Sequence, residues 1–337
     1  MLTALLQPVL GSVNTQQVQQ TVVINAAFKE AADDVVSRDL LAQALALVLF
    51  QHLLDRVPTG RAYVDDCAAQ GQKVMFDHGA VRTVAWPCGA LPRGEAAISR
   101  VLRPLGYALA AVYPLPRLGM TGRAWRHRDW PEDLPQFFVS EFHPERFSSG
   151  LQAAVDRVVG ASTDPLRPDD VAALEQLDRD GQLPLAQATA LLLQLVACFD
   201  RQHAEPHWTD YQALLAESPE MAWISTEGNA FNHATDRVAD LSALAQVQRD
   251  LGRPIKDRIE VSASGRVQQT AFRADPVRRR FVGDAGWVEH DVPGSFYEFI
   301  QRAHLPAESG ETAALDLAFD AGNATGIFGM TAAVQAA

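Results

Sequence analysis

The chain of 337 residues is long enough to bury a large core, and its length alone suggests about two domains. Its net charge of −12 argues against a phosphate-binding surface, so we expect no nucleic-acid partner. The apolar segment at residues 2–10 lacks a basic start and a cleavage site, and no other apolar run reaches the roughly 18 residues of a membrane span. We therefore expect no membrane span either.

The three cysteines of the chain indicate whether the protein is found in an oxidising or a reducing compartment. Cys67, Cys88 and Cys198 are scattered and form no closely spaced pair. An odd number of isolated cysteines is typical of reduced thiols, not of a disulfide framework. We therefore expect a cytoplasmic protein without a thiolate metal site.

Residues 1–73 are expected to form an N-terminal arm and helix. Residues 1–36 are rich in Gln and Val with weak periodicity, which favours a helix followed by an extended arm. From residue 38 to 57, apolar residues recur at helical spacing and cover more than one side, which predicts a buried helix. The Pro-Thr-Gly sequence at residues 58–60 is expected to end this helix.

Residues 74–150 are expected to form a first barrel module. The predicted elements are a strand at 74–85, a helix at 94–102, a strand at 107–113, a loop at 114–135 and a closing strand at 136–142. A helical insertion at residues 151–227 should pack on the barrel. Its apolar stripes predict helices at 168–179, 184–203 and 208–217.

A second barrel module is expected at residues 228–305. The predicted elements are a strand from residue 230, a helix at 239–251, a hairpin of strands at 258–263 and 267–273, and a closing strand at 295–301. Residues 281–288 are ambiguous. Residues 306–337 are expected to form a C-terminal cap or tail, with one helix from residue 311 and residues 322–329 over the pocket.

Both modules approximate the order β-α-β-β-β, with a polar residue early in the first strand and Glu in the last. This arrangement resembles the vicinal-oxygen-chelate fold, in which paired modules curl into an incomplete barrel around a metal. We therefore predict an α+β protein: a vicinal-oxygen-chelate-like incomplete β-barrel of two βαβββ-type modules with an inserted helical layer. The parts should form one compact catalytic domain.

Three polar residues, His78, His233 and Glu298, lie in apolar or β-like segments. A buried carboxylate such as Glu298 is costly unless it is paired or bound to a metal. Two histidines and one carboxylate form the set that holds iron(II) in non-haem oxygenases and leaves positions open for a bidentate substrate and O₂. We predict that these residues bind Fe(2+). In the alternative, both histidines are hydrogen-bonded core residues and Arg302 pairs with Glu298.

Glu141 is a second carboxylate on a predicted closing strand. If it also reached the metal, the set of two histidines and two glutamates would resemble a glyoxalase-type isomerase site. Such a site leaves fewer open positions and argues against O₂ chemistry. We expect Glu141 to support the site from behind the ligands or to be structural.

Arg82 should share a strand face with His78 and Ala80, because side chains alternate with a period of two. Arginine binds a carboxylate through two parallel hydrogen bonds. A short dicarboxylate could therefore chelate the metal near His78 with one end and meet Arg82 with the other. The alternative is an internal salt bridge of Arg82 with Asp77 or Glu141.

The segments Asp77-His-Gly-Ala-Val-Arg-Thr-Val84, Ala230-Phe-Asn-His-Ala-Thr-Asp-Arg-Val238 and Gly294-Ser-Phe-Tyr-Glu-Phe-Ile-Gln-Arg302 resemble the 2-oxoadipate dioxygenase/decarboxylase family. Residues 296–302 are also similar to the final ligand strand of 4-hydroxyphenylpyruvate dioxygenases. The likeness runs from about residue 39 to residue 330. It implies iron(II), ligands His78, His233 and Glu298, and Arg82 as the group that binds the distal carboxylate.

The resemblance further implies the conversion of 2-oxoadipate and O₂ into 2-hydroxyglutarate and CO₂, a step of lysine catabolism. Gln269 is a further candidate pocket residue. The other functions left open are a metal-dependent isomerase or lyase and a non-catalytic ligand-binding protein on the same fold. The sequence leaves the oligomeric state undetermined.

Overall fold

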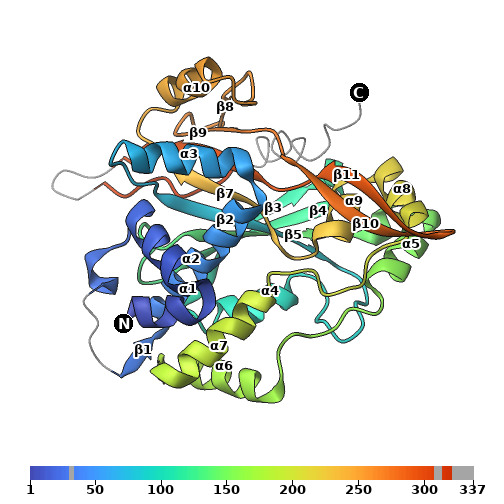
Figure 1. The fold of residues 1–337 in the computed structure, drawn as a ribbon, viewed down its shortest axis with the longest axis horizontal. Coiled ribbons are helices and arrows are strands. Elements are labelled where there is room, and N and C mark those ends of the chain that lie inside the picture. The colour runs from blue at the N-terminus through green and yellow to red at the C-terminus, as the bar shows by residue number, and fades with distance from the viewer. Residues whose placement is uncertain (30–33, 307–312, 321–337) are drawn as a thin grey trace.

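A curled eight-stranded sheet forms the centre of the computed structural model, which describes residues 1–29, 34–306 and 313–320 (Figure 1). The strands follow one another in the sheet as β3 (Tyr107–Leu115), β4 (Met120–His127), β5 (Gln136–Phe142), β2 (Phe76–Val84), β7 (Phe231–Arg237), β12 (Phe296–Arg302), β9 (Val267–Ala271) and β8 (Glu260–Val261). This curled sheet with helices around it confirms the predicted α+β class and incomplete barrel.

The two halves of the sheet have the same strand order. In one half β2 is parallel to β5, followed by antiparallel β4 and β3. In the other half β7 is parallel to β12, followed by antiparallel β9 and β8. The first strands of the two halves, β2 and β7, pair antiparallel with each other. The central strands are therefore β2 and β7, with β12 next to β7.

Helices cover the centre of the sheet from one side, where α2 (Arg38–Arg56) and α3 (Pro58–Ala69) contact β7 and β12 (Figure 1). The Ser37 hydroxyl accepts a hydrogen bond from the Leu40 amide and caps α2. The sequence predicted that residues 58–60 end this helix, and α2 does end at Arg56. After the single residue Val57, Pro58 begins a second helix, α3, because proline is well tolerated in the first turn of a helix.

Additional helices surround this core. They are α1 (Leu2–Thr21), α4 (Ala96–Leu102) and α10 (Leu241–Asp250), together with α5 (Ser149–Val159), α6 (Pro168–Asp180), α7 (Leu185–Ala197), α8 (Trp208–Glu217) and α9 (Pro219–Glu227) between β5 and β7. The short strands β1 (Val35–Ser37) and β6 (Gln182–Pro184) pair with each other. Within the described part of the chain no single helix is long and apolar enough to cross a membrane; only α2 and α3 together are, and they are bent by 115°.

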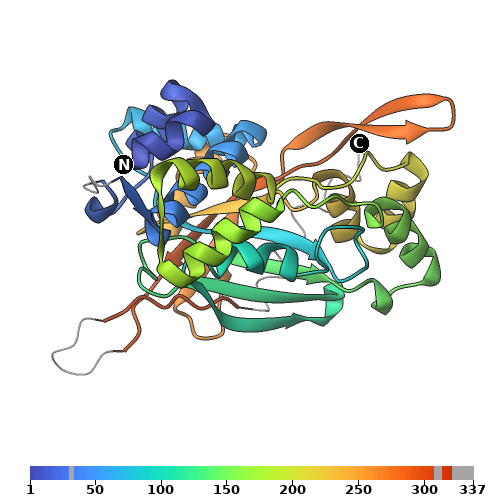
Figure 2. The same cartoon turned by 90° about the horizontal axis from the view of Figure 1, so that it is seen from below.

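Two further segments differ from the sequence-based expectation. The segment predicted as a loop at 114–135 contains β4, whose alternating buried and half-buried residues pair with both β3 and β5. The ambiguous segment at 281–288 belongs to a hairpin of β10 (Pro276–Gly283) and β11 (Gly286–Pro293), which projects from the body (Figure 2). Its turn contains Gly286 at a φ of 123°, a conformation that favours glycine.

The C-terminal segment was expected to contain a helix from residue 311. The described residues 313–320 are not helical. The rest of that expectation, including the proposed cap at 322–329, lies outside the described residues.

A buried carboxyl group, Asp236, lies where α3 meets the sheet. The Tyr63 hydroxyl on α3 donates to one of its oxygens at 2.7 Å, and the Met75 amide donates to the other at 2.8 Å. Burial raises the pKa of Asp236 to about 7, although both hydrogen bonds oppose the rise.

We expect Asp236→Asn to remove a pH dependence of stability. The native state keeps the proton of Asp236 up to a pKa of about 7, whereas the unfolded chain loses it near 3.8. Stability of the wild type should therefore fall as the pH rises between these values, by up to about 4 kcal/mol. Urea unfolding of both proteins across this range measures the effect, and parallel pH profiles would contradict it.

Candidate metal and substrate site

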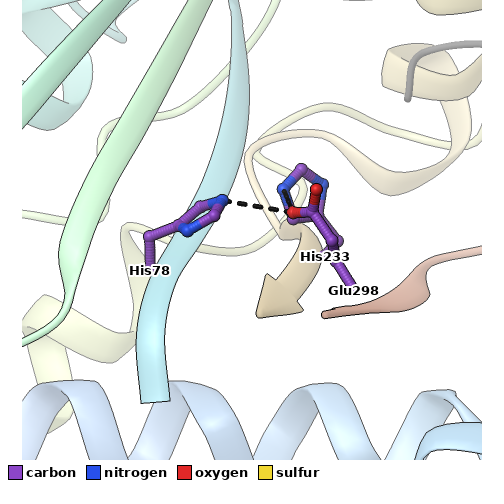
Figure 3. Close-up of side chains that lie close together, drawn as sticks. All are labelled: His78, His233 and Glu298. Carbon is purple, nitrogen blue, oxygen red and sulfur yellow. Dashed lines mark ion pairs between the residues drawn. The ribbon is translucent and has the colours of Figure 1, made fainter. Parts of the chain in front are cut away.

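Three titratable side chains meet where the adjacent strands β2, β7 and β12 lie side by side. His78, His233 and Glu298 are 3%, 6% and 0% exposed. Nε2 of each histidine lies 3.2 Å from the same atom, Oε2 of Glu298 (Figure 3). The fold thus brings together three side chains that are far apart in the sequence.

Two irregularities in the pairing of β2 with β7 place an acceptor beside each histidine. At the first shift of register Asp77 is the extra residue on β2, directly before His78. At the second shift Asn232 is the extra residue on β7, directly before His233. A β-bulge interrupts the regular alternation of side chains and re-aims them. Each extra residue can therefore reach the histidine that follows it.

These acceptors place a proton on Nδ1 of both imidazole rings. Oδ1 of Asp77 lies 2.9 Å from Nδ1 of His78. Oδ1 of Asn232 lies 3.2 Å from Nδ1 of His233. Because carboxylate and amide oxygens only accept hydrogen bonds, Nδ1 of each ring carries a proton. Nε2 is thus the nitrogen that each ring presents to Glu298, an arrangement common among metal-binding histidines.

The carboxylate of Glu298 is ionised despite its burial. Burial favours its protonated form, but His233 and His78 outweigh that effect and hold its pKa below the usual range. The Thr235 hydroxyl donates to Oε2 at 2.6 Å. The other oxygen, Oε1, is buried without a hydrogen-bond partner among the residues that the structure describes. Such an atom is rare in a native protein and indicates a missing partner.

The two histidines differ in their electrostatic surroundings. Burial lowers the pKa of His78, but Asp77 and Glu298 outweigh it, so the net pKa is raised. For His233 burial dominates over Glu298, and the pKa is lowered. A neutral His233 suits a ligand role because only an unprotonated Nε2 binds a metal.

The donor set fits a divalent transition metal. One ligand atom from each of His78, His233 and Glu298 lies within 4.8 Å of the others. Two imidazole nitrogens and one carboxylate oxygen suit iron and related ions. A single cation between them would bind Oε2 of Glu298 and the two Nε2 atoms together. The group could therefore hold a metal ion.

Arg302 connects this group to the C-terminal segment. Its Nε and Nη2 donate to Asp77 at 2.9 and 2.8 Å, and its side chain is 0% exposed. Its Nη1 donates to the carbonyls of Asp316 and Ala318 at 2.9 and 2.8 Å. Arg302 thus pairs with Asp77, not with Glu298 as the sequence had left open. This pairing holds the pKa of Asp77 below its usual range against the effect of burial.

Phe319, the residue after Ala318, covers the site. Its ring meets the ring of His78 edge-on, with 4.8 Å between centroids. It also packs against Phe138 on β5 at 5.0 Å. The segment that Arg302 holds therefore forms an apolar wall over the metal-binding group.

Arg82 lies in the cavity that also contains His78, His233 and Glu298. Its guanidinium lies 4.9 Å from the centre of the Trp223 ring. Burial lowers its pKa to about 10, with Glu220 opposing, so the group keeps its positive charge at neutral pH. The carboxylates considered as its salt-bridge partners hold other arginines: Asp77 binds Arg302, and Glu141 binds Arg123.

Glu141 points away from the cavity. Its neighbour Ser140 pairs with Arg82 and lines the cavity, so Glu141 lies on the opposite face of β5. Its two oxygens accept hydrogen bonds from Arg123 Nη1 at 2.9 Å and from the Glu95 amide at 3.0 Å. The carboxylate near both histidines is therefore Glu298. Gln269, the further pocket candidate, does line the cavity.

Several residues of the site were not singled out from the sequence. They are Asp77, Asn232, Thr235, Arg302 as the partner of Asp77, and Phe319. One sequence signal was available, because each histidine directly follows a residue with a side-chain acceptor, in Asp77-His78 and Asn232-His233. Its meaning depends on the two bulges, which no periodicity indicates.

Comparisons with known proteins agree on one family. A family model described as 2-oxoadipate dioxygenase/decarboxylase matches residues 49–326. The chloroplastic 2-oxoadipate dioxygenase/decarboxylase of Arabidopsis thaliana is 28% identical over 215 residues, 59% of this chain and 51% of that protein. The chloroplastic/amyloplastic protein of Oryza sativa subsp. japonica is 29% identical over 144 residues, 38% of each chain. The matched region thus spans about half or less of these relatives.

Solved structures give the same fold. A crystal structure assigned to the glyoxalase superfamily, from Ralstonia eutropha JMP134, is 56% identical and covers 95% of this chain and 98% of its own, with a TM-score of 0.89. Hydroxyglutarate synthase from Oryza sativa, solved with 2-oxoadipate, is 20% identical with a TM-score of 0.67, covering 88% and 94%. At that identity the second likeness shows the fold alone.

We expect Glu298→Gln to lower the affinity for a divalent metal by about 100-fold or more, because a neutral amide is a far weaker ligand than a carboxylate. Glutamine keeps the size of the side chain and an acceptor for Thr235. The metal content per chain after anaerobic loading with iron(II) and gel filtration measures the loss.

The matched control is Glu141→Gln, which removes the other candidate carboxylate and should leave the metal content unchanged. Equal losses in both variants would contradict the assignment of Glu298 as the ligand. Melting temperatures of both proteins separate a loss of metal from a loss of folding.

Proposed function

The chain belongs to the 2-oxoadipate dioxygenase/decarboxylase family, and we propose that it is an iron(II)-dependent dioxygenase that converts 2-oxoadipate into 2-hydroxyglutarate and CO₂. The observation that carries the proposal is the buried group of His78, His233 and Glu298 in one cavity with Arg82. The substrate, iron, a role in lysine catabolism and a cytoplasmic location go beyond the family assignment and are part of the proposal.

Iron(II) is the metal that this donor set favours, with His78, His233 and Glu298 as its ligands. When bound, iron(II) would supply open positions for the 2-oxo acid and O₂ and the redox capacity for decarboxylation and hydroxylation. The reaction balances with one 2-oxoadipate and one O₂ giving one 2-hydroxyglutarate and one CO₂. No separate 2-oxoglutarate or external reductant is needed, because the 2-oxo acid is itself oxidised.

The protein's own residues would bind and orient the substrate. Arg82 lies on the same strand as His78, separated by three residues, so a dicarboxylate can span from the metal to the guanidinium. Arg82 would hold the distal carboxylate through two hydrogen bonds and set the substrate's direction. Phe138, Phe319 and Ala80 give the cavity apolar walls, which exclude water from the reacting end.

The isomerase alternative required a fourth ligand from Glu141. The contacts of that carboxylate with Arg123 and the Glu95 amide, on the other face of β5, favour the three-ligand set instead. Three protein ligands leave the open positions that O₂ chemistry requires.

The deciding experiment is anaerobic loading with iron(II), followed by O₂ uptake with 2-oxoadipate in the wild type and in His233→Ala. We expect one O₂ consumed per CO₂ and per 2-hydroxyglutarate formed in the wild type, and loss of this activity in the variant, because one of the three ligands is missing. No uptake with any short 2-oxo acid, despite bound metal, would overturn the dioxygenase and favour the isomerase.

Arg82→Ala should retain iron but lower kcat/KM for 2-oxoadipate by about 100-fold or more, because the distal carboxylate loses its charged partner. Steady-state O₂ uptake measures the change. Arg278→Ala, on the exposed hairpin, is the control and should behave as the wild type. An Arg82 variant with unchanged kcat/KM would show that the distal carboxylate binds elsewhere.

A further inference from the structure

Resting on the proposed function, we infer that the side-chain amide of Asn232 is a substrate-binding residue, which donates a hydrogen bond to the distal carboxylate of the 2-oxo diacid beside Arg82. Asn232 is the extra residue of the bulge on β7, 2% exposed, and it lines the cavity together with Arg82 and His233.

Two donors fix the orientation of this amide. Nη2 of Arg82 lies 3.5 Å from Oδ1 of Asn232, at the long end of hydrogen bonding. Nδ1 of His233 lies 3.2 Å from the same oxygen. A guanidinium has only donors, so the amide atom that faces it must be the oxygen. The reversed amide would direct N–H groups at a cation and deprive Nδ1 of His233 of its acceptor.

This orientation leaves the amide nitrogen available. Nδ2 of Asn232 is buried, and it has no hydrogen-bond partner within the part of the chain that the structure describes. Buried donors in native proteins are nearly always satisfied, by protein, water or ligand. A donor left over in a cavity beside a charged arginine is suited to an acceptor that arrives with the substrate.

The position of Asn232 selects the distal end of the substrate. His233 presents Nε2 to Glu298 and Nδ1 to Asn232, so the imidazole ring lies between the amide of Asn232 and the carboxylate of Glu298. The amide oxygen instead touches the guanidinium of Arg82. An oxygen that binds Arg82 can therefore also accept from Nδ2, whereas the chelating end of the substrate is on the other side of the ring. A carboxylate oxygen has two lone pairs and can accept both bonds.

The test compares anaerobic binding of 2-oxoadipate and 2-oxohexanoate to the iron(II)-loaded protein by calorimetry. The two acids have the same carbon chain, and only the first has a distal carboxylate. Asn232→Ala should weaken 2-oxoadipate by about 10- to 100-fold, the range for a hydrogen bond to a charged group, and leave 2-oxohexanoate nearly unchanged. Asn232→Asp should weaken 2-oxoadipate at least as much, because it replaces the donor by a negative charge while keeping the acceptor for His233.

Iron content and melting temperature of each variant provide the readout for the other role of Asn232, its contact with His233. Asn232→Asp should keep its iron because it retains that acceptor. Asn25→Ala, at an asparagine that binds Asp133 outside the cavity, is the matched control and should bind both acids as the wild type does.

Equal weakening of the two acids would overturn the inference, since Asn232 would then act through His233 and the metal. Unchanged preference for 2-oxoadipate in the Asn232 variants would overturn it as well. The proposed function fails in a different way: the iron-loaded wild type would bind neither acid, and the inference would fall with it.

Discussion

An ionised carboxylate at 0% exposure, in the middle of a sheet, must have its charge compensated by groups that the fold brings to it. Glu298 meets two imidazole nitrogens and one hydroxyl, all from the neighbouring strands β2 and β7. No segment close to it in sequence supplies these groups. The arrangement of the three strands is therefore what makes a charge at this position tolerable, and the same arrangement brings together a group that could hold a metal ion.

The two bulges give equivalent positions in the two halves of the sheet different roles. Both put an acceptor next to Nδ1 of a histidine. Asp77 carries a charge and therefore requires Arg302, whose remaining donors bind the C-terminal segment. Asn232 is neutral and contacts Arg82 in the cavity. Nδ1 of His78 is thus held by a pair of charged residues within the protein, whereas Nδ1 of His233 is held by a residue of the cavity where we propose that substrate binds.

The site is built on strands, with little contribution from loops. Strand backbones are fixed by hydrogen bonds on both sides, so the distances between His78, Arg82 and His233 are set by sheet geometry. The sheet thus holds the positions of the side chains, and the residues at those positions decide the chemistry. Here Phe319, which comes directly after the Ala318 carbonyl that Arg302 holds, completes the enclosure from outside the sheet.

The strands that carry the site could be predicted from local sequence, because β2, β7 and β12 are apolar segments interrupted by a few polar residues. The sequence also indicated His78, His233, Glu298 and Arg82, since a buried polar or charged side chain is costly unless it has a partner. Local patterns did not reveal β4, whose Gly, Arg and His resemble a loop until two partner strands cover it.

The partners of these side chains depend on how distant strands pair. Arg302 lies only four residues from Glu298 on the same strand, yet it binds Asp77, which is 225 residues away in the sequence. Glu141 and Ser140 differ by one position, and the pleat sends one to Arg123 and the other into the cavity. The bulges at Asp77 and Asn232 arise from the pairing of two strands, so neither strand encodes them alone. Periodicity fixes which face a side chain occupies, but register and bulges, which are properties of strand pairs, fix what it touches.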